Sequence, residues 1–568
     1  MTDFKSYDRV RRSASPLQLD LVEAFAAGRV SRREFVRLGL MLGMTTAALA
    51  ACGGTDTPSG SGSSAAATDV GVGGADVKVK TGGSMRIASI APSSPGLDSV
   101  TMIDLATYGV VGQVYEYLCA ASGDLKLIPQ LAESWTPNAD GSVWTFKLRQ
   151  NVKWGDGSAF TSADVVETME RLVKAGNSGL KGIIAAGSVA APDAGTAVFT
   201  LIGPNGNFPY LVSSDNPQSA INPKALAPGT TLDKSTIGGT GPFKLDPGYD
   251  AKTGATFSRN DAWWGGKTPL DKSEWVFFQD LQAQVVALQS GSVDGIVQFQ
   301  VLGGEGLLND PNLTLIKLRA ATHRQIWMRT DTGQFKDAKV RQALGYCLDR
   351  AAMVQALFKG AAEIGNDHVI APVYPYFDPA IAQRPRDVAK AKALLAEAGV
   401  TGPLKAVLNC GKLQEIPDLA TLIKNNAAEA GFDLTISVQD LSSFYGKSWC
   451  PEKPVDPPCS GATELGIVDY GHRGTPDVYL NAALKGKGVW NSSQYNSAAF
   501  DTAFADFQKS VGVDAQKVAA GKLEQILLDD TPVAVPYFYN FLSAHSKKYA
   551  GASVTGLGQL NLSKAGLV

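Results

Sequence analysis

The sequence predicts an α/β fold, because stretches with the period of a strand alternate along the chain with stretches that have the period of a helix. Residues 142–149 alternate apolar and polar side chains, which is typical of a half-buried strand. Residues 162–173, 337–357 and 387–398 carry apolar side chains at helical spacing. We therefore expect helices layered on sheets, and we find no internal repeat.

Local signals mark where several of these elements begin or end. A strand is expected at 84–88, and a helical pattern follows around 108–118. Thr161 and Asp164 have the spacing of a capping box at the start of the next helix. Gly399 is expected to end the helix over residues 387–398, because glycine adopts the left-handed conformation that terminates helices.

The first 52 residues are typical of an export signal. Arg32 and Arg33 form a twin-arginine motif, the address of a route that exports folded proteins. The apolar run over 38–51 has 14 residues, too few to span a bilayer as a stable helix. Small residues lead into Cys52, the pattern that a lipoprotein signal peptidase cuts while the cysteine receives lipid. The alternative is a chance arginine pair before a weak buried helix.

The mature chain is therefore expected outside the cytoplasm, at the outer face of the cytoplasmic membrane or in the periplasm, with a lipid anchor at Cys52. Two acyl chains on that cysteine would give stable attachment. Residues 53–80 are rich in Gly, Ser, Ala and Thr, so we expect a flexible tether. From Cys52 onward 44 Lys and Arg face 49 Asp and Glu, a net charge near −5, which argues against a nucleic-acid partner.

Six cysteines occur in the chain. In an oxidising compartment Cys450 and Cys459 are expected to form a disulfide around a proline-rich loop. Cys119, Cys347 and Cys410 lie in apolar patterns and are expected to be buried thiols. No pair has the spacing of zinc ligands, so no metal or other cofactor is expected.

A set of segments in a fixed order resembles one family. The segments include LIPQLAESW at 127–135, WTFKLR at 144–149, VKWGDG at 152–157, TSADV at 161–165, GTGPFK at 239–244, LQSGSVD at 288–294 and VRQAL at 340–344. In this order the chain resembles the extracellular solute-binding proteins of family 5, the oligopeptide- and dipeptide-binding lipoproteins of ABC importers. The resemblance covers roughly residues 81–568.

The resemblance implies a two-lobed fold of the periplasmic-binding-protein (Venus flytrap) type. The first lobe would comprise residues 81–318 and 531–568, with an extra subdomain near 119–235, and the second lobe residues 319–530. A ligand would be enclosed between the lobes. The resemblance also implies delivery to a membrane permease and its ATPase, and we expect a monomer.

Asp469 and Tyr470 are the first candidates for ligand contact. A peptide's amine needs a carboxylate in a closed cleft, because an unpaired buried charge is costly. Asp469 ends the apolar run 465–468, and the family's peptide-binding members place their amine-binding aspartate in a similar Asp-Tyr context. The alternative is that Asp469 caps the following turn. Asp477 is a rival carboxylate, for which a helix cap is the favoured interpretation.

Arg329 and Trp327 are the next candidates. Many relatives carry asparagine at the position of Arg329, and its guanidinium could pair with a carboxylate or a sugar hydroxyl pair. The alternative is an ion pair with an acid between the lobes. Trp327 and Tyr470 are chosen among the aromatics because each neighbours a charged candidate. Asp98 is the expected contribution of the first lobe. His472 and Arg473 are expected in an exposed turn.

Catalysis is the rival class of function. The sequence contains no Gly-x-Ser-x-Gly, His-Glu-x-x-His or Ser-x-x-Lys motif around a suitable nucleophile, and the four histidines are widely spaced. We therefore expect a binding protein without catalytic residues. Its ligand would be a peptide or a similar small polar solute. The alternatives are an oligosaccharide, an opine-like conjugate or chelated nickel, and less favoured is an exported hydrolase.

Overall fold

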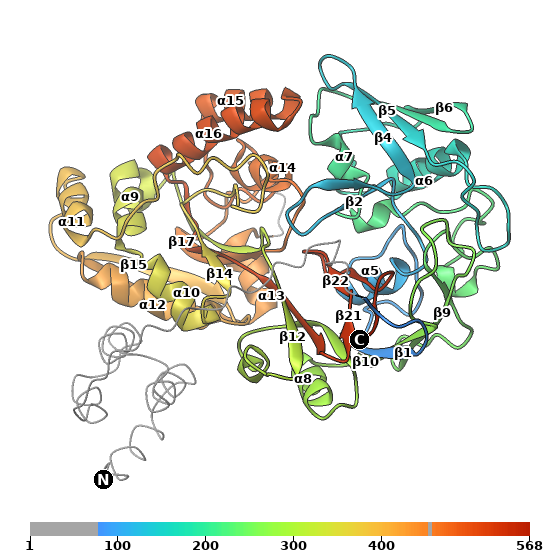
Figure 1. Ribbon diagram of the computed structural model, residues 1–568. Helices are drawn as coiled ribbons and strands as arrows, with labels where there is room; N and C mark the ends of the chain where they lie inside the picture. Colours follow the sequence, from blue (N-terminus) through green and yellow to red (C-terminus); the bar gives the residue numbers. More distant parts are fainter. Residues whose placement is uncertain (1–77, 452–456) are drawn as a thin grey trace, which may run out of the picture.

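The structure, a computed structural model, describes residues 78–451 and 457–568. The described chain forms two halves, each built around a large sheet (Figure 1). We call residues 80–318 with 541–568 the first lobe and residues 323–539 the second lobe. The export motif, Cys52 and most of the expected tether lie outside the described residues.

The first lobe is built on a mixed sheet whose central strand is β1. Beside β1 run two parallel strands, one on each side, and the remaining pairs are antiparallel. In spatial order the strands are β12 (Leu313–Leu318), β20 (Phe541–Ser546), β11 (Gly295–Phe299), β1 (Ser84–Ile90), β10 (Lys272–Phe278), β9 (Gly254–Arg259) and β8 (Phe243–Leu245).

Helices and small sheets complete the first lobe. A four-stranded antiparallel sheet and a helix lie within the region expected to be a subdomain: β4 (Ala132–Pro137), β5 (Val143–Leu148), β7 (Thr196–Thr200), β6 (Val189–Asp193) and α6 (Ser162–Lys174). The other elements are α5 (Leu105–Val111), β2 (Cys119–Ala121), β3 (Leu127–Pro129), α7 (Phe208–Leu211), α8 (Leu281–Gln289), β21 (Tyr549–Ala550), β22 (Ser553–Val554), β23 (Leu560–Asn561) and β24 (Gly566–Leu567).

The second lobe has its own mixed sheet. Its strands, in spatial order, are β14 (Ala362–Ile364), β19 (Tyr537–Tyr539), β13 (His323–Met328), β17 (Leu465–Tyr470), β15 (Leu404–Gly411) and β16 (Phe432–Gln439), with β18 (Val533–Ala534) also paired to β13. Its helices are α9 (Ala338–Cys347), α10 (Arg350–Phe358), α11 (Val388–Glu397), α12 (Ile416–Ala428), α13 (Leu441–Ser443), α14 (Asp477–Tyr479), α15 (Ala498–Lys509) and α16 (Val513–Asp530).

Two short segments cross between the lobes. One joins β12 to β13 through residues 319–322, and the other joins β19 to β20 at Asn540. The two crossings lie side by side, because the Tyr539 N–H donates to the Thr322 carbonyl at 2.9 Å. The return to the first lobe was expected at residue 531. It occurs later, because β18 and β19 pair within the sheet of the second lobe.

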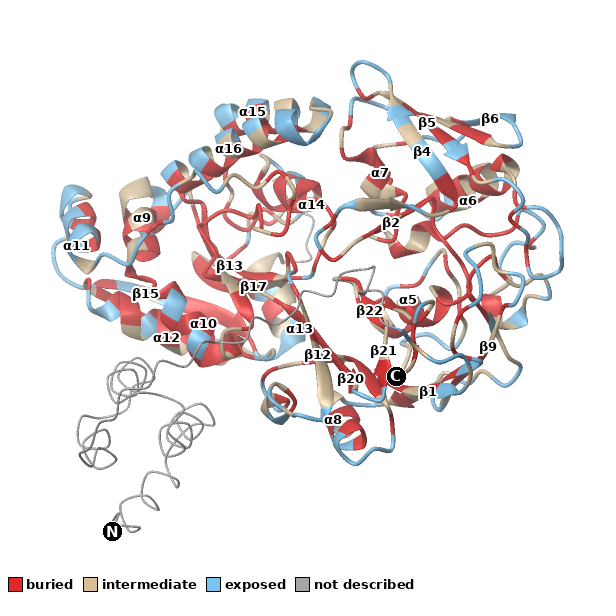
Figure 2. Ribbon diagram, viewed as in Figure 1, coloured by how far each residue is buried: buried red, intermediate tan, exposed pale blue. Residues whose placement is uncertain are grey.

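Buried apolar residues form three clusters. One fills the first lobe around Phe257 and Trp275, and another contains residues of both lobes, from Ala88 and Ile296 of the first to Leu408 and Ile467 of the second. The third cluster is rich in aromatic side chains of the second lobe and includes Ala121 and Leu125 of the first. Figure 2 shows buried residues along both large sheets and exposed residues on the outer faces of α11 and α15. Through Ala121 and Leu125 the third cluster reaches the boundary between the lobes.

Most of the elements expected from periodicity are present. Strand β5 matches the alternation over 142–149, and α6 begins with the predicted capping box of Thr161 and Asp164. The single helix expected over 337–357 is wrong: α9 ends at Cys347 and α10 begins at Arg350. Leu348 is extended between them, and the Asp349 carboxylate caps α10 by accepting from the Ala352 N–H. The apolar pattern is continuous over both helices, but the cap at Asp349 starts a new helix within it.

A candidate ligand cleft between the lobes

A cavity of about 820 Å³ is lined from both lobes. The first lobe contributes Lys126, Trp135 and Tyr210, and the second contributes Tyr374, Val513 and Gln516. Arg319, in one of the crossings, also lines it. Most of the lining surface is apolar, with a few polar groups, which is the usual composition of a small-molecule site. The cavity can therefore hold a solute that contacts both lobes at once.

Direct hydrogen bonds join the lobes beside this cavity. The Gly206 N–H of the first lobe donates to the Gln508 carbonyl of the second at 2.7 Å. Asn207 then bridges two residues of the second lobe: its amide donates to Asp477 Oδ2 at 2.8 Å, and its Oδ1 accepts from Gln516 Nε2 at 2.7 Å. Asp477 starts α14, but its side chain reaches across the boundary, so the interpretation as a simple helix cap is wrong.

His472 and Asp215 meet at the same boundary. His472 is only 3% exposed, so the exposed turn expected for it is wrong. Its Nδ1 accepts from the Ala321 N–H at 3.0 Å, and its Nε2 lies 3.9 Å from Asp215 Oδ1 of the first lobe. Glycine at position 474 permits this approach, since a Cβ there would lie 2.3 Å from Asp215 Oδ2.

Several polar atoms of this boundary have no hydrogen-bond partner among the described residues. They are both carboxylate oxygens of Asp215, Oδ1 of Asp477, Nε2 of His472 and the hydroxyl of Tyr376. Burial raises the pKa of the Asp477 carboxyl above its usual value. Buried polar atoms are normally hydrogen-bonded, so these unpartnered groups at the boundary between two lobes require an explanation.

Asp469 lies near the end of β17, directly opposite Arg324 of β13. It is partly exposed, and its Oδ1 accepts a hydrogen bond of 2.5 Å from the Tyr445 hydroxyl. Burial, followed by the charge of Asp469, raises the pKa of that hydroxyl. The Arg324 guanidinium pairs instead with Glu415. Within the described residues, the other carboxylate oxygen of Asp469 has no hydrogen-bond donor, and the side chain is not fully buried.

Tyr470 belongs to the aromatic cluster at the lobe boundary. Its ring stacks on His323 with centroids 5.4 Å apart and contacts Tyr479 and Trp490 edgewise or at a tilt. The Tyr470 hydroxyl is buried and has no hydrogen-bond partner among the described residues. Tyr470 and Asp469 are thus adjacent in sequence but have different environments.

Trp327 has no exposed surface in this structure, so it is not available to a ligand in the way that the sequence predicts. Its indole N–H donates to the Thr463 carbonyl at 2.8 Å, and its ring packs on Phe444. A Cβ at Gly466 of the neighbouring strand would lie 2.2 Å from the indole. The side chain fills the space above that glycine and is part of the core.

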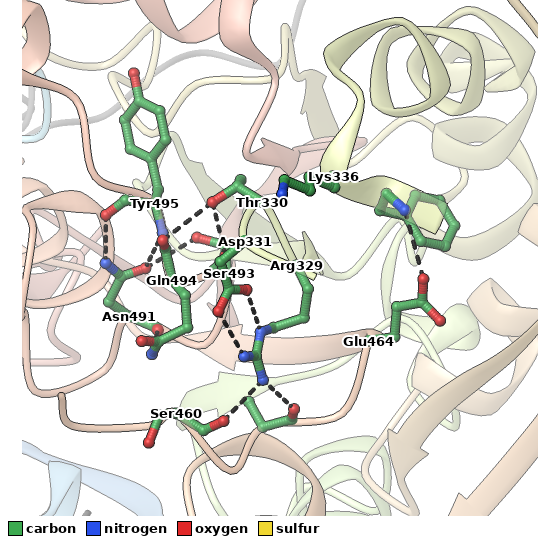
Figure 3. Close-up of polar contacts among 12 residues, drawn as sticks. Arg329, Thr330, Asp331, Lys336, Ser460, Glu464, Asn491, Ser493, Gln494 and Tyr495 are labelled. Atoms are coloured by element: carbon green, nitrogen blue, oxygen red, sulfur yellow. Dashed lines mark hydrogen bonds and ion pairs between the residues drawn. The ribbon is translucent and has the colours of Figure 1, made fainter. Parts of the chain in front are cut away.

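Arg329 is fully engaged by its own lobe (Figure 3). Its Nε and one terminal nitrogen donate to the two carboxylate oxygens of Asp331, both at 2.8 Å. Its other terminal nitrogen donates to the carbonyls of Ser460 and Ala462 at 2.9 and 2.7 Å. The partner is an acid two residues along the chain and not a ligand, which corrects the expected role. The network holds β13 to the segment after the disulfide between Cys450 and Cys459.

Asp98 also uses both carboxylate oxygens locally. It accepts from the Val100 N–H at 2.9 Å and from the Thr101 hydroxyl at 2.8 Å, which closes a turn. Of the five ligand candidates, the structure thus places Asp469 and Tyr470 at or beside the third apolar cluster, which is rich in aromatic side chains, and the other three in structural contacts.

No pattern in the sequence indicated Asp215 as a candidate. This residue lies in the sequence Ser-Ser-Asp-Asn-Pro, which is typical of a loop and carries no ligand signal.

Two large sheets joined by paired crossings, with a cavity lined from both sides, define a two-lobed binding protein. Comparison with known families gives the same class: residues 126–458 match the family described as bacterial extracellular solute-binding proteins, family 5 Middle. The chain belongs to this family, whose members are solute-binding proteins.

Individual relatives cover most of the chain. A probable peptide ABC transporter periplasmic-binding protein of Sinorhizobium fredii is 26% identical over 490 residues, 80% of this chain and 90% of the relative. The glutathione-binding protein of Salmonella typhi is 24% identical and covers 82% and 91%. Among solved structures, HbpA2 of Haemophilus parasuis superposes with a TM-score of 0.75 at 21% identity, covering 86% of this chain and all of that one.

Two further observations concern membrane-spanning helices and groups of metal ligands among the described residues. In the ranges 78–451 and 457–568, no helix is long and apolar enough to cross a membrane. In the same ranges, no group of three or more His, Cys, Asp or Glu side chains is arranged to hold a metal ion. Cys119, Cys347 and Cys410 are buried free thiols, as predicted.

Proposed function

We propose that this protein is the substrate-binding lipoprotein of an ABC importer, which captures a peptide or a similar small polar solute between its lobes and presents it to a membrane permease. The observation that carries this proposal is the cavity of about 820 Å³, which is lined by both lobes and by a crossing segment. A solute that contacts both walls stabilises the state in which they approach each other, so binding shifts the population toward closure.

The peptide class is favoured by what similar proteins are named for. They include a probable peptide-binding protein and glutathione-binding proteins, and one solved neighbour holds the peptide STSA. Other neighbours hold mannopinic acid or a nickel–histidine complex. An opine-like conjugate and chelated nickel therefore stay as the alternative ligands, and Asp469 and Tyr470 stay proposed contacts.

Mass spectrometry of the native protein tests the capture directly. We expect a bound solute that is released unchanged on unfolding, because a closed cleft retains its cargo. The mass of that solute assigns its class. Time-dependent hydrolysis of the cargo would contradict a pure binding role and favour the exported hydrolase.

The proposed anchor and export route are tested separately. Cys52→Ala is expected to yield unlipidated protein in the soluble fraction, and retained attachment to membranes would contradict the lipid anchor. Replacement of Arg32 and Arg33 by lysine is expected to block export, because the twin-arginine route requires its address. Normal secretion of that variant would exclude the route for folded proteins.

A further inference from the structure

Two carboxylates of opposite lobes are buried at the boundary without a compensating cation. The Asp215 side chain is 3% exposed, and the Asp477 residue is 9% exposed. Three of their four oxygens have no hydrogen-bond partner among the described residues. The fourth, Asp477 Oδ2, accepts from the neutral amide of Asn207 at 2.8 Å. Within residues 78–451 and 457–568, neither carboxylate forms an ion pair with lysine or arginine.

His472 does not neutralise Asp215. Because its Nδ1 accepts the Ala321 N–H, the ring proton lies on Nε2 and the imidazole is neutral. The Nε2 atom points toward Asp215 Oδ1, but the distance of 3.9 Å is too long for a hydrogen bond. The imidazole is therefore a buried, unpartnered donor directed at a carboxylate that lacks a counterion.

A pair of tyrosines connects these carboxylates to the cavity. Tyr374 lines the cavity and stacks on Tyr376, with ring centroids 5.6 Å apart. Tyr376 is 1% exposed, and its hydroxyl has no partner among the described residues. Burial is the main cause that raises the pKa of both phenols. The charge of Asp477 is the next cause for Tyr376, whereas for Tyr374 the neighbouring tyrosines come before Asp215 and Asp477. The two carboxylates thus act on the same tyrosine pair, beside the same cavity.

We propose that Asp215 and Asp477 form a cation-binding subsite of the cleft, which takes a primary ammonium group of the captured solute. This inference rests on the proposed capture between the lobes. An ammonium carries three N–H donors and a positive charge, and the site offers three unpartnered carboxylate oxygens and the Tyr376 hydroxyl. A water molecule would satisfy hydrogen bonds but would leave both charges uncompensated.

The subsite also gives a reason for closure to depend on the ligand. When the lobes separate, water solvates Asp215 on one lobe and Asp477 on the other. When they meet without a cation, both carboxylates lose that water, which opposes contact. A solute with an ammonium group removes this opposition, so it binds the closed state with higher affinity than the open state.

Calorimetric titration tests the ligand half of the proposal. The mature protein is stripped of cargo by unfolding and refolding, then titrated with tri-alanine and with N-acetyl-tri-alanine. We expect the wild type to bind only the free amine, and D215N and D477N to lose roughly 10–100-fold in affinity for it. The matched control is D246N, a partly buried aspartate of the first lobe that accepts from Ser258 away from the cleft. Circular dichroism checks that each variant is folded.

D469N separates this subsite from the one that the sequence predicts. Equal binding of the free and acetylated peptides by the wild type overturns the ammonium subsite. If D469N loses affinity for tri-alanine while D215N and D477N do not, the assignment of the ammonium subsite to Asp215 and Asp477 is overturned.

Small-angle X-ray scattering of the ligand-free protein tests whether the two carboxylates oppose closure of the lobes. This measurement tests the proposal even if tri-alanine does not bind. The double variant D215N/D477N is expected to have a smaller radius of gyration than the ligand-free wild type, because its lobes meet without burying charge. An unchanged radius of gyration overturns the proposal. If neither tri-alanine nor the co-purified cargo compacts the wild type, the proposed capture itself fails. If cargo compacts the wild type and the variants equally, only the subsite fails.

Discussion

Buried charge has two different environments in this protein. In the second lobe Glu415 accepts from Arg324 Nε at 2.8 Å and from the Tyr537 hydroxyl at 2.9 Å, and Arg324 also donates to Gln414. At the lobe boundary the Asp215 carboxylate has neither a lysine or arginine partner nor a hydrogen bond among the described residues. Both carboxylates are withdrawn from water, yet one is fully paired and the other is not.

The difference indicates which charges belong to the fold and which belong to the ligand. A buried pair such as Arg324 and Glu415 needs both partners, because the loss of either leaves an isolated charge in the interior. An isolated carboxylate at a boundary that opens has a partner only when a solute is present. Four substitutions that each convert a carboxylate to its amide test this distinction.

The largest effect is expected for Glu415→Gln. It removes the negative partner of Arg324, whose side chain is 1% exposed, and leaves the guanidinium buried without a counterion. We expect the free energy of unfolding to fall by about 3–5 kcal/mol. Denaturant titration followed by circular dichroism measures it. A loss below about 1 kcal/mol would contradict the assignment of this pair to the fold.

Glu116 is intermediate between the two environments, since it is buried and accepts from the indoles of Trp263 and Trp264 but forms no ion pair among the described residues. Burial raises its pKa from 4.5 to about 7. The folded state therefore favours the protonated form, and the stability from this group, complete below pH 4.5, is lost as the pH rises through about 7.

Glu116→Gln removes this dependence on pH. The difference in the free energy of unfolding, variant minus wild type, is expected to increase by about 3 kcal/mol from pH 4.5 to pH 8. This increase does not depend on how large the difference is at low pH. Unfolding titrations at a series of pH values measure the difference. Parallel curves for the two proteins would show that Glu116 does not change its proton affinity on folding.

Asp215→Asn is expected to act in the opposite direction from Glu415→Gln. It removes an unpaired buried charge, so the free energy of unfolding of the ligand-free protein should stay constant or rise by about 1–2 kcal/mol at pH 7. The same denaturant titration measures it. A loss comparable to that of Glu415→Gln would mean that Asp215 has a structural partner.

The smallest effect is expected for Glu429→Gln, the exposed counterpart of Glu415. Glu429 accepts from Arg386 at 2.7 Å, but the two side chains are 54% and 31% exposed. Water screens this pair, so we expect a change below about 1 kcal/mol that disappears in high salt. A large effect here would show that burial does not explain the difference between the two environments.

The sequence predicted the fold better than the site. Period and capping placed β5, α6 and α11, because each pattern is set by neighbours a few residues apart. The same reasoning joined α9 and α10, since it weighed apolar spacing over the cap at Asp349. For the site it selected Arg329 because relatives carry asparagine at that position, and it could not foresee the ion pair that Arg329 forms with Asp331.

What the amino-acid order determined alone is the α/β class and the family motifs, which are local patterns; the export signal is a further local pattern and stays a prediction. The tertiary structure decided which charged groups meet. Asn207 and Asp477 are 270 positions apart, and Asp215 and His472 belong to different lobes. Whether a carboxylate is paired depends on atoms that the chain brings together only after both lobes have folded and docked. No local pattern encodes such a contact.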